Sequence, residues 1–167
     1  MMPALHRKEW PKVRGRSADR NPLGFTMIEL LIAVAIILTI AAIAIPNFLA
    51  ALNQARIAKA VADIHAIGID VQAYNLSHSD QYPSTLADID KAINDPWGQP
   101  YQYLNFADTK GKGQMRKDRF LVPINSYFDL YSMGKDGQSV APLTAKASQD
   151  DIIWANDGAF VGLASDF

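Results

Sequence analysis

The stretch "GFTMIELLIAVAIILTI", residues 24–40, determines the architecture of the chain. It opens an apolar run that extends to Ile45 and contains one charged residue, Glu29. A helix of about twenty residues rises about 30 Å, which matches the hydrocarbon core of one bilayer. The pattern therefore predicts a membrane-spanning helix over residues 25–45. It also raises the question of why a carboxylate lies within that helix.

The net charge of the segment before this span is opposite in sign to that of the remainder of the chain. Residues 1–24 carry six Lys/Arg and two Asp/Glu, whereas the remainder carries ten Lys/Arg and fifteen Asp/Glu. A basic segment before an apolar span is typical of a cytoplasmic N-terminus. The acidic remainder argues against a nucleic-acid partner. The 167 residues include no cysteine, which excludes disulfides and thiolate metal sites.

A cleaved secretory signal is the alternative interpretation of the apolar run. Such signals have an apolar core of about 7–15 residues followed by a small-residue cleavage site. The run from residue 25 to residue 45 is longer, and more helix-like sequence follows it. The pattern favours a span that is retained.

Beyond Pro46 the sequence becomes amphipathic. Apolar residues recur at spacings of three and four, at Ile57, Val61, Ile64, Gly68 and Val71, and Ile67 and Tyr74 widen the stripe. We expect the helix to continue to about Ser77 and this stripe to pack on a small sheet. Pro46 lacks a backbone N–H, so it should loosen the helix. It is either a point that melts during assembly or a kink at the membrane exit.

The residues after position 78 have the pattern of short strands separated by turns. Ser84 or Thr85 is positioned to cap a short helix over Leu86–Ile93. Strands are expected in "PYQYLNF" (100–106), "RFLVPI" (119–124) and "YFDLYSM" (127–133), and a last short strand or a turn in "DDIIWAND" (150–157). The fold class is therefore predicted to be α+β, a long N-terminal helix packed on a small C-terminal antiparallel β-sheet.

Two parts of the chain carry a family resemblance. The stretch "GFTMIELLIAVAIILTIAAIAIPNF" (24–48) resembles the N-terminus of type IV pilins and pseudopilins in its Gly-Phe junction, its early glutamate and its proline. The stretches "DPWGQPYQY" (95–103), "DLYSMGKDG" (129–137) and "DDI" (150–152) resemble the globular domain of the major pseudopilin of the type II secretion system. Residues 107–128 and those after Gly162 match no pattern of that family.

The resemblance implies four parts and a processing step. Residues 1–24 are a basic leader that is removed, and 25–45 form a transmembrane and filament-core helix. Residues 46–77 continue that helix, and 78–167 form a periplasmic, β-rich globular domain. A prepilin peptidase would cut between Gly24 and Phe25 and methylate the new amine of Phe25.

The same resemblance implies a location and partners. The mature chain would cross the bacterial inner membrane once, with its N-terminus cytoplasmic and its globular domain periplasmic. It would then join copies of itself in a helical periplasmic filament. The other implied partners are the minor pseudopilins and the inner-membrane assembly platform.

Glu29 has a physical explanation in such a filament. A carboxylate costs about 2.5–3.5 kcal/mol at a bilayer centre and less near its surface. Cleavage creates an α-amine at Phe25 that is cationic at neutral pH. We expect it to neutralise Glu29 of the adjoining subunit, and a pair within one subunit is conceivable before assembly. The alternative is a glutamate that reaches the lipid headgroups. The hydroxyl of Thr26 is expected to bond to a helix carbonyl.

The resemblance also implies a calcium site in the C-terminal loops. Its matching positions are the carbonyl of Met133 and the side chains of Asp136, Asp150 and Asp151. Calcium takes six to eight oxygen ligands, and it would restrict the loops as a disulfide does. The segment between Asp136 and Asp150 is longer than in the family, which leaves the other donors open. The alternative is a set of solvated turn aspartates.

The function implied is that of a structural subunit of the type II secretion pseudopilus, which drives proteins across the outer membrane. We expect no enzymatic activity, because the sequence lacks the catalytic motifs of serine hydrolases, phosphate-loop proteins and zinc proteases. One alternative is a type IV pilus subunit for adhesion, motility or DNA uptake. Another is a periplasmic enzyme or binding module whose membrane anchor stays uncut.

Overall fold

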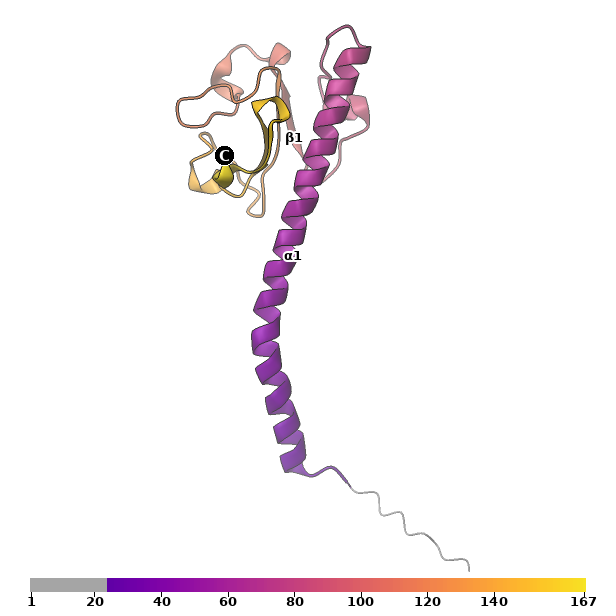
Figure 1. The fold of residues 1–167 in the computed structure, drawn as a ribbon, viewed down its shortest axis with the longest axis vertical. Coiled ribbons are helices and arrows are strands. Elements are labelled where there is room, and N and C mark those ends of the chain that lie inside the picture. The colour runs from indigo at the N-terminus through magenta and orange to yellow at the C-terminus, as the bar shows by residue number, and fades with distance from the viewer. Residues whose placement is uncertain (1–23) are drawn as a thin grey trace, which may run out of the picture. The chain divides into compact units, whose positions relative to one another are not determined.

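The computed structural model describes residues 24–167, so the predicted leader lies outside the described residues except for Gly24. The main elements are one helix and four strands: α1 (Met27–Ser77), β1 (Gln102–Asn105), β2 (Phe128–Ser132), β3 (Ile152–Ala155) and β4 (Phe160–Leu163) (Figure 1). Short 3₁₀ turns lie between them. The chain forms two compact units, the first ending at Ile43 and the second comprising Ala44–Phe167.

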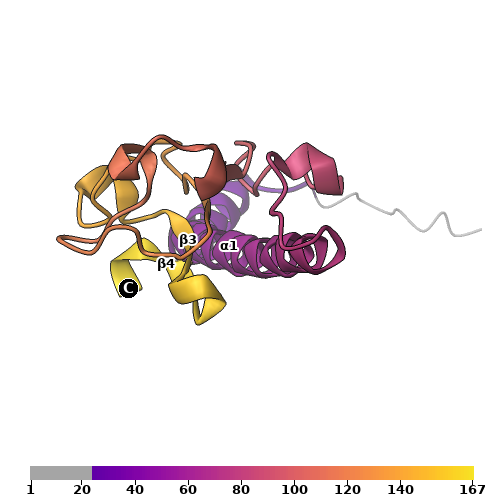
Figure 2. The ribbon, with the colours of Figure 1, turned by 90° about the horizontal axis from the view of Figure 1, so that it is seen from above.

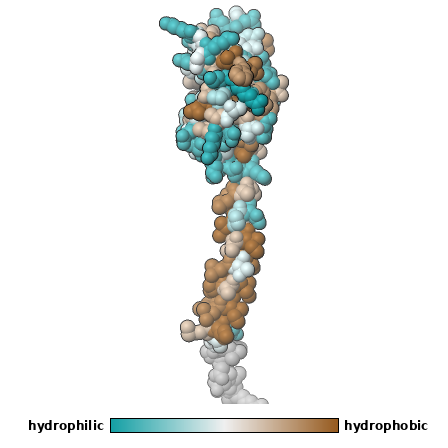
Figure 3. Space-filling model, turned by 90° about the vertical axis from the view of Figure 1, so that its left-hand side faces the viewer, coloured by the Kyte–Doolittle hydropathy of each residue, from teal (hydrophilic) through white to brown (hydrophobic). Residues whose placement is uncertain are grey.

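The part of α1 in the first unit is apolar and exposed around its circumference. The most apolar 18-residue window of α1 has no buried residue, and α1 is long and apolar enough to cross a membrane. Figure 3 shows this part of the helix mostly in the colour of hydrophobic residues. A surface of this kind needs lipid or another protein chain to cover it.

In the second unit α1 continues through Pro46 to Ser77, so the predicted end of the helix is confirmed. Its buried residues are Ala60, Ile64, Ile67, Gly68 and Val71, with Ile57 and Val61 partly buried beside them. This agrees with the predicted stripe except at two positions. Ala60 was not expected in it, and Tyr74 stacks on His78 with ring centroids 3.7 Å apart.

The four strands form an antiparallel sheet in sequence order, β1-β2-β3-β4. The register pairs Leu104 with Asp129, Tyr131 with Ile153, and Trp154 with Val161. Side chains of alternate strand residues face α1: Phe128 and Leu130 from β2, and Ile152 and Trp154 from β3, pack in one core with the stripe of the helix. Figure 2 shows β3 and β4 beside α1. The predicted α+β class is confirmed.

The other face of the sheet carries a second, smaller core. Ile153 and Ala155 of β3 pack there with Ile124, Leu143 and Ala164. All four residues of β3 are therefore buried, because loops from both sides of β2 cover this face. This covering also removes the charged side chains of Arg116, Asp129 and Asp151 from water.

Two local expectations were wrong, and one strand was missed. Residues 119–124 form no strand, because Arg119 adopts a φ of 46° and Pro123 has no N–H to donate; a single bridge joins Asp118 to Leu121. The expected helix over Leu86–Ile93 is one 3₁₀ turn that ends at Ile89, where Asp90 takes a φ of 54°. Strand β4 was not expected.

Candidate functional site

The junction between Gly24 and Phe25 lies in exposed chain just before α1. Residues 24–26 belong to no helix or strand, and Phe25 is 76% exposed. A methyl group added at Gly24 would meet nothing within 4 Å. The fold around Gly24 therefore does not require glycine, whereas a protease that must approach the backbone closely would.

Thr26 and Glu29 form a capping box at the start of α1. The backbone N–H and the hydroxyl of Thr26 donate to Oε2 of Glu29 over 2.9 and 2.7 Å. The N–H of Glu29 donates to the Thr26 hydroxyl over 3.3 Å. The expected bond from Thr26 to a helix carbonyl was wrong, because the hydroxyl serves the first turn instead. The spacing Thr-x-x-Glu signals this motif in the sequence.

The capping box changes how the charge of Glu29 is balanced. Its carboxylate accepts two hydrogen bonds and lies at the positive end of the helix dipole. Phe25, whose amine cleavage would release, directly precedes the N–H that donates to this carboxylate. Both hydrogen bonds to this carboxylate therefore come from one neutral residue, Thr26.

The C-terminal loops bring together two of the predicted calcium ligands. Oδ2 of Asp150 accepts from the backbone N–H of Lys135 and of Asp136 over 2.8 and 3.1 Å. Oδ1 of Asp136 accepts from the N–H of Gln138 over 2.8 Å. These bonds close the turn after β2. Gly134 permits it with a φ of 64°, and a Cβ there would lie 2.6 Å from the carbonyl carbon of Asp150.

Asp151 has a different partner. It is fully buried, and its Oδ2 lies 2.5 Å from Nη2 of Arg116 and accepts from the hydroxyl of Ser139 over 2.5 Å. Burial raises the pKa of the Asp151 carboxyl to about 6, against the opposing effects of Ser139 and Arg116. The carboxyl group faces a buried guanidinium.

The predicted calcium ligands do not converge on one point. Among residues 24–167 no group of three His, Asp or Glu side chains is close enough to hold a metal ion. Asp151 Oδ1 is buried without a hydrogen-bond partner, whereas Asp136 and Asp150 each direct one carboxylate oxygen to backbone N–H groups of the turn. The three predicted carboxylate ligands therefore form no ready metal cluster in this arrangement. Calcium binding itself stays a prediction.

The "DPWG" stretch forms a turn that is anchored to the sheet. Oδ1 of Asp95 accepts from the backbone N–H of Trp97 and Gln99 over 3.0 and 2.9 Å. Its Oδ2 accepts from the hydroxyl of Ser132 on β2 over 2.5 Å. Asp95 is 5% exposed, and Trp97 packs against the core that contains the helix stripe. This arrangement is structural.

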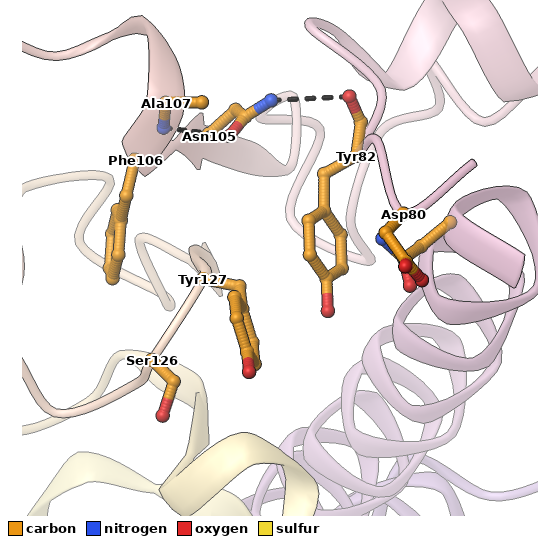
Figure 4. A pocket seen from close by; sticks show the side chains of 8 residues that line it. Asp80, Tyr82, Asn105, Phe106, Ala107, Ser126 and Tyr127 are labelled. Atoms are coloured by element: carbon orange, nitrogen blue, oxygen red, sulfur yellow. Dashed lines mark hydrogen bonds between the residues drawn. The ribbon is translucent and has the colours of Figure 1, made fainter. Parts of the chain in front are cut away.

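A cavity of about 730 Å³ opens near the end of α1 in the second unit (Figure 4). The rings of Tyr82 and Tyr127 stack in it with centroids 5.1 Å apart. Asn105 donates to the carbonyl of Tyr82 over 3.2 Å and accepts from the N–H of Ala107. Its described lining includes no histidine, lysine or arginine, and no pair arranged for acid–base chemistry.

Comparisons with known proteins agree on one family. A model of the prokaryotic N-terminal methylation motif matches residues 19–45. Type II secretion system core protein G of Pseudomonas aeruginosa is 31% identical over 141 residues, which cover 71% of this chain and 87% of that protein. The core protein G of Aeromonas hydrophila is 28% identical, over 72% of this chain and 87% of that protein. That of Vibrio cholerae is 29% identical, over 71% and 84%. No solved structure matches.

Proposed function

This chain belongs to the family of type II secretion system core protein G, and on that premise we propose that it is a structural subunit of the secretion pseudopilus. The observation that carries the proposal is an exposed apolar helix with Glu29 in its first turn. That helix directly follows the Gly24-Phe25 junction, within the matched methylation motif. The pilus alternative is not favoured, because the relatives reported above are all core proteins of secretion systems.

The proposed activation is proteolysis between Gly24 and Phe25, followed by methylation of the new amine. Both steps need an exposed N-terminal chain, and residues 24–26 are exposed. Methylation keeps the ammonium charge, so the mature subunit carries a cation at Phe25 and an anion at Glu29. The leader adds four net positive charges on the cytoplasmic side before it is removed.

Assembly then follows from the cost of an unpaired charge in lipid. While the subunit waits in the inner membrane, the capping box with Thr26 partly satisfies Glu29. In the filament the ammonium of an incoming subunit replaces these neutral donors on the Glu29 of its neighbour. A close ion pair in low dielectric is favourable only when the stagger between subunits is correct, so Glu29 sets the register.

The apolar surface of α1 determines the rest of the assembly. The part of α1 that precedes Ala44 buries nothing within the subunit, and it exchanges lipid for neighbouring helices in the filament core. The globular domain would stand in the periplasm. The proposed partners are further copies of this chain, the prepilin peptidase, the minor pseudopilins and the inner-membrane assembly platform. No catalytic role is proposed.

Secretion in a deletion strain tests this function. Cells that lack the gene should fail to release the proteins that depend on type II secretion, and the wild-type gene should restore release. Cells carrying Glu29→Ala should make and process the subunit but secrete poorly. Normal secretion in the deletion strain together with lost twitching motility would instead point to a pilus subunit.

A further inference from the structure

Two buried carboxylates lie on the face of the sheet that points away from α1. Asp129 on β2 is 1% exposed and Asp151, just before β3, is fully buried. Isolated charges in such a place are strongly unfavourable unless they are paired. A cation beside them would offset this cost, and the resemblance places calcium at Asp151.

Arg116 supplies a cation within this layer. Its side chain is 8% exposed, and Nη2 lies 2.5 Å from Oδ2 of Asp151. Nη1 donates to the Ser139 hydroxyl over 2.6 Å, and the guanidinium lies 4.3 Å from the ring centroid of Tyr131. The backbone N–H of Arg116 donates to Oδ2 of Asp129 over 2.5 Å. Of the three ion pairs among residues 24–167, this is the one that is buried on both sides.

The contacts of Arg116 join separate segments of the chain. Arg116 comes from residues 107–128, the stretch that matched no family pattern, and Ser139 comes from the long loop between β2 and β3. Asp129 and Tyr131 belong to β2 itself. A cation that ties two loops to one sheet limits the conformations of both, as a bound metal would.

The guanidinium also opposes a metal ion at the same carboxylate. Any calcium bound by Asp151 would lie within a few ångströms of a fixed positive charge, and like charges at that distance repel. Asp136 and Asp150 meanwhile use oxygens to accept from backbone N–H groups of the turn. The arginine and the ion therefore compete for one role.

We propose that Arg116 is the fixed cation of the C-terminal loops, so that this chain holds them closed without calcium. The role goes beyond the proposed function and does not depend on it, since it concerns the stability of the globular domain. It also assigns a structural role to the segment 107–128, because this segment contains the arginine that pairs with Asp151.

Thermal unfolding of the full-length protein in detergent, followed by tryptophan fluorescence, tests this proposal. The wild type should melt at the same temperature in millimolar calcium chloride and in EGTA. Arg116→Met should lower the melting temperature in EGTA by roughly 10–20 °C, as expected when a buried pair loses one partner. The matched control Arg119→Met, at an exposed position, should change it little.

Two further variants keep the test decisive if Arg116→Met does not fold. Arg116→Lys retains the positive charge but lacks the planar guanidinium with its paired N–H donors. Its melting temperature should lie between those of the wild type and Arg116→Met. The double variant Arg116→Met/Asp151→Asn should be at least as stable as Arg116→Met, because it removes the stranded anion. A calcium-induced rise in the wild-type melting temperature would overturn the proposal. So would an Arg116→Met variant as stable as Arg119→Met.

Discussion

Replacing Gly68 by alanine should destabilise this protein, although alanine is the better helix former. In an exposed helix interior the change from glycine to alanine stabilises by about 1 kcal/mol. Gly68 instead lies on the buried stripe of α1, against the ring of Trp154. A Cβ at this position would stand 2.5 Å from Cε3 and 2.6 Å from Cη2 of that ring.

The size of the effect follows from the room available to the ring. Carbon atoms attract at about 3.5–4.0 Å, so the ring or the helix must move by roughly 1 Å. The ring cannot retreat, because Trp154 is 3% exposed and a Cβ at Gly158 would lie 2.6 Å from its Cη2. Overpacking of this kind costs about 1–3 kcal/mol, and the upper end applies to a ring held from two directions. Subtracting the gain of about 1 kcal/mol in helix propensity leaves a net loss of about 2 kcal/mol in folding stability.

The assay is thermal unfolding of the full-length protein in detergent, with a fall of about 5–10 °C expected for Gly68→Ala. Gly113→Ala is the control, because a Cβ there meets nothing within 4 Å and should leave the melting temperature nearly unchanged. In a Trp154→Phe background the ring is smaller, so Gly68→Ala should become neutral or stabilising. Stabilisation by Gly68→Ala in the wild-type background would refute the packing argument.

Three further substitutions test other contacts. Glu29→Ala should leave cleavage intact but reduce the filament yield, measured by shearing and immunoblotting; a normal yield contradicts the register role. Thr26→Val removes the capping box, which is worth about 0.5–2 kcal/mol, and should speed hydrogen exchange in the first turn of α1; unchanged exchange would show that the box is dispensable. Asp95→Ala leaves the Ser132 hydroxyl without its acceptor and should lower stability by about 1–3 kcal/mol in denaturant unfolding, whereas an unchanged midpoint would show that the turn holds without it.

The helix and most of the sheet were predictable because they follow periodic patterns. The spacing of Ile57, Val61, Ile64 and Val71 placed both the end of α1 and the face that packs on the sheet. Strands β1, β2 and β3 carry β-branched and aromatic residues between turn residues, and they form within the predicted stretches. These signals are local, so one sequence contains them.

Other features depend on conformations and partners that no local pattern encodes. Residues 119–124 have the composition of a strand, but the positive φ of Arg119 and the missing N–H of Pro123 prevent pairing. Strand β4, "FVGL", is short and contains a glycine, and it forms because the turn at Asn156-Asp157-Gly158 returns it to β3. Composition alone therefore could not predict the missing strand at 119–124 or the presence of β4.

The candidate site likewise contains features that the sequence signals and features that it does not. The junction at Gly24 and the capping box of Thr26 and Glu29 both lie within six residues, and the sequence contains their signals. The pair of Arg116 and Asp151 joins positions 35 residues apart, and the sequence, which suggested calcium as the partner of Asp151, gives no sign of the arginine. Only the folding of two loops onto the sheet brings them together. Long-range pairing of single charged residues therefore cannot be found without the structure.

The N-terminal mass of the native protein tests the central claim most directly. Processing and assembly through Glu29 require a cation at the start of the mature chain. Protein isolated from the membrane should therefore begin at Phe25 and carry one added methyl group on its amine. A native protein that retains residues 1–24 would contradict the account, because Glu29 would then have no new cation to meet.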